Sequence, residues 1–376
     1  MILNRRHALL GSLAATAPLG MAHAEARPVA PSPVLTEAMT GTATPGMAAV
    51  VIRAETAEPE QVAGLRRHGR PDLVKTGDRW HLGSDGKAMT VTLIARLVER
   101  GVLSWDRPLS RLLPDLAADM RAEYRNVTLP DLLSHRAGLP ENHDDIAFFA
   151  TFHTDRTPLP VQRLRYIKTA LADAPVGHAG GTPSYSNTGL LIAAAVAERA
   201  TGRSFESLMA SEVFRPLGMT GFSFNQTPGL DEPCGHIEGR PADRPTDSNP
   251  SMFAPAGAMR FTLADWSRFC IDHLKGEKGR GRILRGETYR FLHSPQGGES
   301  FALGWGVAPS VAGRKGPALT HAGSDGNWYA LVALFPQTGN GLLLVANAGE
   351  AMGGEKAVFA AFRSLVLSVA DPVEPA

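Results

Sequence analysis

Strand-forming patterns stand at both ends of this 376-residue chain and helical patterns fill its middle, which limits the folds that it can adopt. Runs typical of strands occur at residues 46–52, 62–65, 301–307, 328–335 and 342–347. The Asn340-Gly341 pair between the last two runs is a strong hairpin signal. We therefore expect an α/β protein of the α+β kind, with one antiparallel sheet built from both ends of the chain.

The stretch between these ends predicts a large helical lobe inserted into the sheet framework. Candidate helices lie at 129–135, 188–201, 205–214, 263–274 and 287–293. Two more, at 33–39 and 356–369, are expected to flank the sheet as terminal helices. The prediction is one domain over 25–376, with a sheet lobe at about 25–83 and 296–376 and a helical lobe at about 84–295.

Composition and charge narrow the class of partner. Hydrophobic residues make up 43% of the chain, which is enough for a sizeable core. The net charge of +1 gives no electrostatic case for nucleic acid, so a small molecule is the expected partner. Cys234 and Cys270 are the only cysteines, and we favour two unpaired thiols over a disulfide because nothing in their spacing demands proximity.

The first 24 residues are expected to be an export signal rather than part of the fold. Arg5 and Arg6 precede a mildly apolar run at 8–15, and residues 22–24 form a small-x-small cleavage site. The paired arginines favour the twin-arginine route, and the Sec route stays open. No later apolar run reaches the length of a membrane span. We expect a periplasmic or secreted protein with no stable membrane anchor.

Ser84 and Lys87 are the first candidate catalytic pair. An amphipathic pattern predicts a helix that starts at Ser84, and residues three apart share a helix face. Lys87 would therefore hold its amine beside the Ser84 hydroxyl, as a serine nucleophile requires of its base. The free amides of a first helical turn would favour a developing oxyanion. The alternative is an ordinary helix start, with Ser84 as N-cap and Lys87 in solvent.

Tyr185 and Asn187 form a second candidate group, in a loop just before the helix expected at 188–201. A loop fixed by a following helix can direct a phenol and an amide into a cleft. The alternative is that Tyr185 packs in the core and Asn187 caps the helix.

His321 and Gly323 form the third group, directly before the expected strand at 328–335. Gly323 would let a substrate backbone approach closely, although a histidine at such a position is more often structural. The sequence Gly-Ser-Asp-Gly occurs twice, beginning at Gly83 and at Gly323. Only the first copy is followed by a lysine and a helical pattern, which favours Ser84 over Ser324 as the nucleophile.

Taken together, these groups resemble the motifs of a known superfamily. Ser84-x-x-Lys87, Tyr185-x-Asn187 and His321-x-Gly323, in that order, look like those of the serine β-lactamases and penicillin-binding proteins. The likeness is to their class C-like branch, which includes family VIII-type esterases, DD-peptidases and D-aminopeptidases. Phrases at 132–139, 185–189, 216–219 and 303–306 agree with it. The resemblance covers most of the mature chain and implies a β-lactamase/transpeptidase-like fold.

Roles follow from the resemblance residue by residue. It implies that Ser84 is acylated and that Lys87 with Tyr185 handles its proton. Asn187 would hold Lys87 and contact the substrate. The oxyanion hole would use the N–H groups of Ser84 and Ser324. No cofactor is implied.

The third motif departs from the β-lactamase pattern, because His321 and Ala322 stand where lysine and threonine are usual. Both usual groups help to recognise a substrate carboxylate in related enzymes. We therefore favour an esterase or amidase acting on small ester, amide or lactam substrates through an acyl-enzyme. β-Lactamase or D-Ala-D-Ala carboxypeptidase activity is the alternative, followed by a penicillin-binding or sensing protein without turnover.

Other chemistries fit less well. The Gly-x-Ser-x-Gly elbow of α/β-hydrolases is missing from the sequence. Gly86-Lys87 lacks the first glycine and the final serine or threonine of a phosphate loop. His143, Asp144, Asp145 and His153 match no known metal-ligand spacing, so we expect no metal site there.

Overall fold

One antiparallel sheet organises the computed structural model, which describes residues 30–373 except residue 299. The export signal expected at 1–24 lies outside the described residues. The sheet has the order β2 (Thr56–Ala57), β1 (Gly46–Arg53), β12 (Asn340–Ala346), β11 (Tyr329–Phe335), β10 (Arg314–Ser324) and β9 (Gly306–Val311). A further strand, β3 (Gln61–Gly64), also pairs with β1. The two ends of the chain thus meet where β1 pairs with β12.

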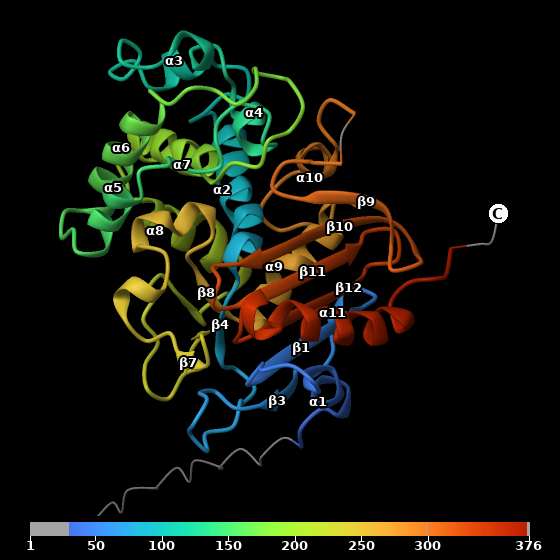
Figure 1. Ribbon diagram of the computed structural model, residues 1–376. Coiled ribbons are helices and arrows are strands. Elements are labelled where there is room, and N and C mark those ends of the chain that lie inside the picture. Colours follow the sequence, from blue (N-terminus) through green and yellow to red (C-terminus); the bar gives the residue numbers. More distant parts are fainter. Residues whose placement is uncertain (1–29, 299, 374–376) are drawn as a thin grey trace, which may run out of the picture.

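The sheet is buried on both faces, because its strands carry apolar residues at successive positions. Side chains alternate between faces along a strand, so the two sets belong to different cores. On β1, one core takes Ala48, Val50 and Ile52, and the other takes Met47, Ala49 and Val51. The terminal helices α1 (Pro33–Met39) and α11 (Gly354–Leu365) cover the second face (Figure 1). The first face packs against α9 (Leu263–Gly276) and the helical region.

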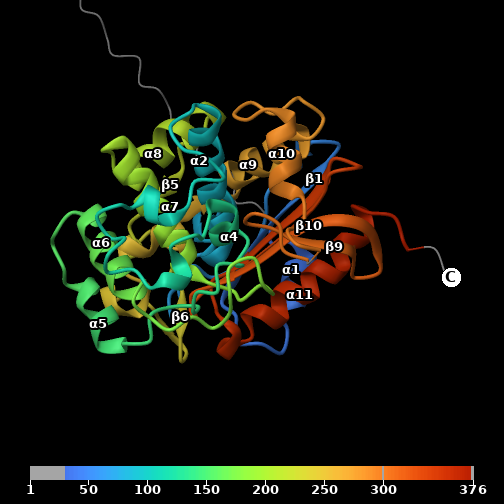
Figure 2. The same cartoon turned by 90° about the horizontal axis from the view of Figure 1, so that it is seen from above.

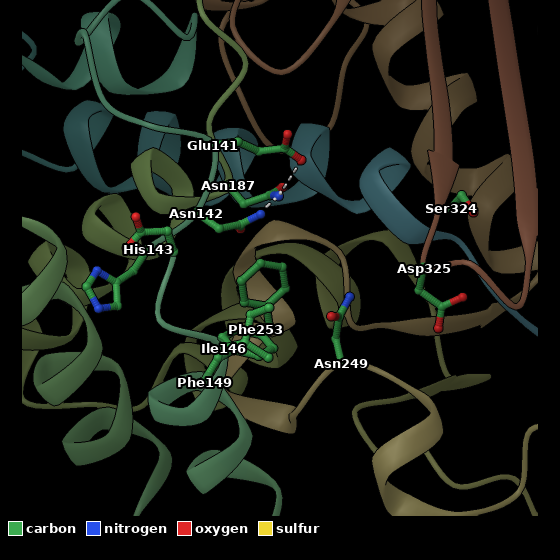
Figure 3. A pocket seen from close by; sticks show the side chains of 11 residues that line it. Glu141, Asn142, His143, Ile146, Phe149, Asn187, Asn249, Phe253, Ser324 and Asp325 are labelled. Atoms are coloured by element: carbon green, nitrogen blue, oxygen red, sulfur yellow. Dashed lines mark hydrogen bonds between the residues drawn. The ribbon is translucent and has the colours of Figure 1, made fainter. Parts of the chain in front are cut away.

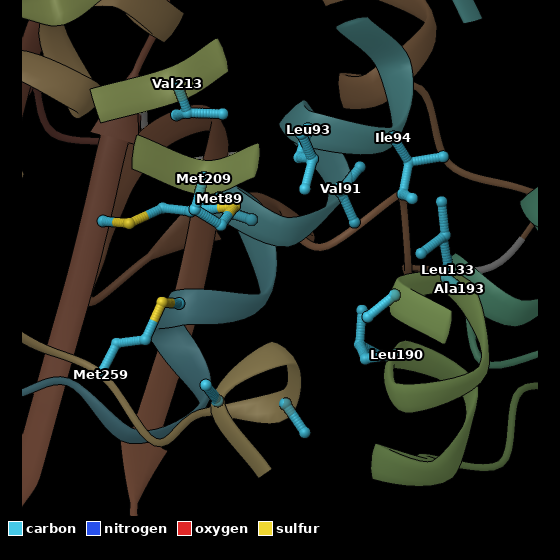
Figure 4. Packing of buried hydrophobic residues seen from close by; sticks show 14 of the residues in the cluster. Met89, Val91, Leu93, Ile94, Leu133, Leu190, Ala193, Met209, Val213 and Met259 are labelled. Atoms are coloured by element: carbon cyan, nitrogen blue, oxygen red, sulfur yellow. The ribbon is translucent and has the colours of Figure 1, made fainter. Parts of the chain in front are cut away.

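The helical region is centred on α2 (Lys87–Glu99), whose residues are almost all buried. Helix α2 contacts α7 (Asn187–Thr201), and Ile94 of α2 lies on the side of Leu190 and Ala193 of α7 (Figure 4). Because apolar or buried residues occupy most sides of α2, the helix lies inside the protein. The view from above shows other helices arranged around it, namely α4 (Leu129–Leu133), α5 (Ile146–Ala150), α6 (Leu159–Ala170), α8 (Phe205–Leu208) and α10 (Gly286–His293) (Figure 2). Helix α3 (Leu109–Leu112) lies at the top of Figure 1.

Short strands connect the two regions. They are β4 (Arg79–His81), β8 (Arg260–Thr262) and β5 (Phe222–Ser223) in one small sheet, and β6 (His236–Ile237) with β7 (Arg240–Pro241) in another. Strand β4 is followed almost directly by the turn that contains Ser84. Helix α9, which belongs to the segment expected to form the helical lobe, packs on β1, β11 and β12. The division into two lobes with the stated boundaries stays a prediction.

Two local expectations are wrong. The helix does not start at Ser84: residues Gly83–Gly86 form a 3₁₀ turn and α2 begins at Lys87. The expected strand at 301–307 begins only at Gly306. Gly304 has a φ of 74°, and a Cβ there would lie 3.0 Å from Cα of Ala88. This close packing against α2 keeps the segment before Gly306 out of the sheet.

The expected terminal helices, hairpin, helix end and unpaired thiols agree with the structure. The terminal helices and the β11–β12 hairpin form as predicted, and Gly202 ends α7 in the left-handed conformation. Cys234 and Cys270 are buried free thiols. None of the helices in the described part of the chain has the length and apolar composition to cross a bilayer. Among the described residues, no group of three or more His, Cys, Asp or Glu side chains could hold a metal ion.

Candidate active site

Ser84 lies on the 3₁₀ turn at the point where that turn touches β10. Gly83 has a φ of 51°, a conformation that favours glycine. A Cβ on Gly83 would lie 2.4 Å from the Ser324 nitrogen, so only glycine allows this approach. Within the described chain, the Ser84 N–H has no hydrogen-bond acceptor. It is therefore free to bind an oxyanion.

Lys87 is fully buried one turn after Ser84. Its Nζ lies 2.8 Å from Ser84 Oγ and also donates to the Ala256 carbonyl. Burial lowers the pKa of Lys87 to about 7, while the nearby carboxylates of Asp85 and Glu141 oppose this shift. A lysine with this pKa is partly neutral at physiological pH, and its free amine can accept the Ser84 proton.

Tyr185 is the second side chain that contacts the Ser84 hydroxyl. Its hydroxyl donates to Ser84 Oγ at 2.6 Å, and its ring lies 4.9 Å from Lys87 Nζ. Burial raises the pKa of Tyr185, so the phenol stays protonated and can serve as a donor. The His135 ring packs against Tyr185 at 4.6 Å and accepts the Ser186 N–H, which fixes the loop. Burial lowers the pKa of His135 to about 3, so this ring is neutral.

Asn187 differs from the expectation in its partner. It is the first residue of α7, whose N-cap is Ser186 rather than Asn187. Its side-chain amide donates to Asn142 Oδ1 at 3.1 Å and lies 3.5 Å from Glu141 Oε1. No hydrogen bond joins Asn187 to Lys87, whose amine donates to Ser84 Oγ and to the Ala256 carbonyl.

His321, Gly323 and Ser324 line the same centre from the end of β10. His321 Nδ1 lies 2.9 Å from the Ala322 carbonyl and 3.4 Å from Asp85 Oδ1. A Cβ on Gly323 would lie 2.7 Å from the Ser84 nitrogen, so this position also requires glycine. The structure thus brings together all seven sequence-predicted site residues, from three distant parts of the chain.

Two cavities flank this centre. One of about 420 Å³ is lined by Glu141, Asn142, His143, Asp144, Ile146, Phe149, Asn187, Asn249, Phe253, Ser324 and Asp325 (Figure 3). The other, of about 380 Å³, is lined by Tyr185, Ser300, Phe301, Gly306, Val307, Ala308, Thr320, His321 and Ala322. The first cavity combines Ile146, Phe149 and Phe253 with mostly polar residues, and the second is mainly apolar with a few polar groups. Among the described residues that line them there is no lysine or arginine.

Several residues near Ser84 could not be identified from the sequence. Glu141 and Asn142 approach Asn187, and Asp85 lies buried beside both Lys87 and His321. Burial raises the pKa of Asp85 to about 6, although His321 and Lys87 oppose this shift. The only available signal for Asp85 was a carboxylate placed between a serine and a lysine.

Comparison with known proteins agrees with this geometry. The family model described as Beta-lactamase matches residues 32–363, and the chain belongs to this family. It is therefore a serine hydrolase of the β-lactamase-related kind, with a β-lactamase/transpeptidase-like fold.

The chain is also similar to individual relatives and to one solved structure. Penicillin-binding protein 4 of Amycolatopsis lactamdurans is 28% identical over 78% of each chain. The D-alanyl-D-alanine-carboxypeptidase/endopeptidase AmpH of Escherichia coli K12 is 24% identical over 69% of this chain and 68% of its own length. The octameric penicillin-binding protein homologue from Pyrococcus abyssi has a TM-score of 0.71 at 21% identity, covering 89% of this chain and 76% of its own. That last likeness concerns the fold alone.

Proposed function

We propose that the protein is an exported esterase or amidase that acts on small, uncharged acyl substrates through an acyl-enzyme at Ser84. Ser84 Oγ would attack the carbonyl carbon while Lys87 takes the hydroxyl proton. Tyr185, which lies against Oγ, would help to return that proton to the leaving group when the ester or amide bond breaks. Water would then release the acid and regenerate Ser84.

The oxyanion formed in each half-reaction would lie between the Ser84 and Ser324 N–H groups. Such preorganised donors commonly contribute roughly 10²–10³-fold to turnover. The free Ser84 N–H and the contact between its turn and the end of β10 support this assignment.

The proposed substrate class rests on which residues line the two cavities. Neither has a lysine or arginine among its described lining residues, and Ala322 has no hydroxyl to offer. A buried carboxylate without a partner costs several kcal/mol, or roughly a hundredfold or more in binding. Glu141 and Asp144 would add repulsion in the first cavity. A neutral ester meets none of these penalties.

A second candidate is cleavage of β-lactams or D-Ala-D-Ala peptides. The names of the Amycolatopsis and Escherichia coli relatives favour it. These substrates carry a carboxylate, so the two proposals predict opposite orders of kcat/KM.

The test is a side-by-side measurement of kcat/KM for a neutral short-chain p-nitrophenyl ester, a penicillin and a D-Ala-D-Ala peptide. We expect the ester to be the best substrate of the parent. Ala322→Thr, alone or with His321→Lys, should narrow the gap by adding carboxylate donors. Ala308→Thr, which adds a hydroxyl elsewhere in the same cavity, is the matched control. Faster cleavage of the penicillin by the parent would favour the second candidate, and acylation without turnover would favour a sensor.

Export is the remaining part of the proposal, and the charged and apolar pattern of residues 1–24 supports it. The mature protein should begin at Glu25. Mass spectrometry of periplasmic material measures this directly, and retained Met1 would contradict it. Replacing Arg5 and Arg6 by lysine should block export only if the twin-arginine route is used.

A further inference from the structure

The nucleophile turn and the end of β10 are near-copies in sequence and lie against each other. Residues 81–86 and 321–326 both read His-x-Gly-Ser-Asp-Gly. Each glycine faces the other backbone: a Cβ on Gly83 would meet the Ser324 nitrogen, and one on Gly323 would meet the Ser84 nitrogen. The two expected oxyanion donors are therefore next to the contact between the two segments.

The histidine of each segment faces the aspartate of the other. His81 Nε2 lies 3.8 Å from Asp325 Oδ2, and His321 Nδ1 lies 3.4 Å from Asp85 Oδ1. The aspartates and His81 are completely enclosed, and His321 is nearly so. The contact is thus reciprocal, with one histidine–aspartate pair on each side of the touching glycines.

Hydrogen bonds orient the first pair. His81 Nδ1 accepts the Gly83 N–H at 3.1 Å, so the ring proton is on Nε2 and points toward Asp325. Burial lowers the pKa of His81, which keeps the ring neutral. Asp325 Oδ1 accepts the N–H groups of Asn327 and Trp328, which leaves Oδ2 for His81. At 3.8 Å the two atoms are too far apart for a hydrogen bond, and neither His81 Nε2 nor Asp325 Oδ2 has a hydrogen-bond partner among the described residues. The Gln226 side chain also lies beside His81.

We propose that His81 and Asp325 are positioning residues, which fix the Gly83–Ser84 backbone against the Ser324 backbone so that both N–H groups point at one oxyanion. His81 lies two residues before Gly83, and Gly83 directly precedes the first donor, Ser84. Asp325 directly follows the second donor, Ser324. The Asp85–His321 pair ties the same two backbones from the opposite side. Because catalysis depends on donor placement to within about 1 Å, losing one tie should weaken transition-state binding more than substrate binding. This inference rests on the proposed function.

The test compares two substitutions of one residue. In His81→Asn the amide oxygen can still accept the Gly83 N–H, but the arm toward Asp325 is lost. In His81→Gln the longer side chain can still reach Asp325. The readouts are kcat and KM for the neutral ester and the Ki of a phenylboronic acid, whose Ser84 adduct places a hydroxyl in the oxyanion hole.

We expect His81→Asn to lower kcat, and to raise the Ki of the boronic acid, by about tenfold or more, while KM changes by less than about twofold. His81→Gln should recover most of the lost kcat and of the lost affinity for the boronic acid. In Asp325→Asn the side-chain NH₂ would face the His81 N–H, so kcat and the affinity for the boronic acid should fall together. This variant also provides a second test if His81→Asn does not fold. Glu277→Gln, which removes the charge of the partly buried carboxylate that contacts His293 at the end of α9, is the control for loss of stability alone.

Parental kcat and Ki in folded His81→Asn and Asp325→Asn would overturn the inference. So would an equal loss in Glu277→Gln. Failure of the proposed function looks different: the parent itself would neither hydrolyse the ester nor bind the boronic acid in a Ser84-dependent way, which would overturn both proposals.

Discussion

Segments 81–86 and 321–326 agree at five of six positions, yet they fold differently. The first leaves β4 at His81 and forms a 3₁₀ turn that leads into α2. The second forms the last part of β10, paired with β11, and ends in a turn after Ser324. Since the local sequences are so similar, the difference comes from the residues after each segment and from the elements packed against it. Lys87 and an apolar helix come after the first segment, and Asn327-Trp328 come after the second.

The comparison shows that Gly-Ser-Asp-Gly does not by itself specify a nucleophile. Ser84 Oγ has a lysine at 2.8 Å and a tyrosine at 2.6 Å. Among the described residues, Ser324 Oγ accepts only the Gly326 N–H of its own turn, at 3.0 Å. The same tetrapeptide therefore supplies a side chain in one place and a backbone amide in the other.

The largest expected effect separates these two serines. Ser84→Ala should lower kcat for the ester by roughly 10³-fold or more, because the attacking atom is removed. Ser324→Ala keeps the backbone N–H and should lose less than about tenfold. Steady-state turnover of the two purified variants measures the difference. Equal losses would mean that the two serines share one role, contrary to the different contacts of their hydroxyls.

A second substitution tests what makes the first segment different. Lys87→Arg keeps a cation one turn after Ser84 but cannot supply a neutral base, because arginine stays protonated. Its kcat/KM should fall by roughly 10²–10⁴-fold, about as far as in Lys87→Ala. Ester hydrolysis gives the measurement. If Lys87→Arg retained most of the activity, the lysine would act only through its charge.

The smallest effect concerns pH. Lys87 accepts a proton only when neutral, and its pKa in the folded protein is about 7, so kcat/KM should rise through about pH 7. The Glu141 carboxylate raises the pKa of Lys87. Glu141→Gln removes that charge and should move the rising limb to lower pH. The pH profile of kcat/KM reports this ionisation in the free enzyme. A limb shifted to higher pH would contradict the assignment of Lys87 as base.

The sequence was most informative where chemistry depends on short spacing. Ser84 and Lys87 are three residues apart, so one helical turn was enough to bring them together. Tyr185 and His321 were then predicted as site residues because their motifs follow the Ser84 motif in the same order as in the superfamily that the sequence resembles. Residues whose role depends on distant packing could not be found in this way. Glu141 matters because its loop meets α7, and Asp85 because β10 places His321 beside it.

The same limit applies to the fold. Alternating and helical periodicity predicted the terminal helices and the β11–β12 hairpin. It failed at the 3₁₀ turn and at residues 301–305, where glycines allow one backbone to approach another. Such contacts leave no periodic pattern in the sequence.

The most direct test of the central claim is to locate the covalent adduct. The parent protein would be treated with a fluorophosphonate, digested and analysed by tandem mass spectrometry. The account predicts modification of Ser84, with the peptide that contains Ser324 unmodified and no labelling in Ser84→Ala. An adduct on Ser324, or labelling that persists in Ser84→Ala, would contradict it.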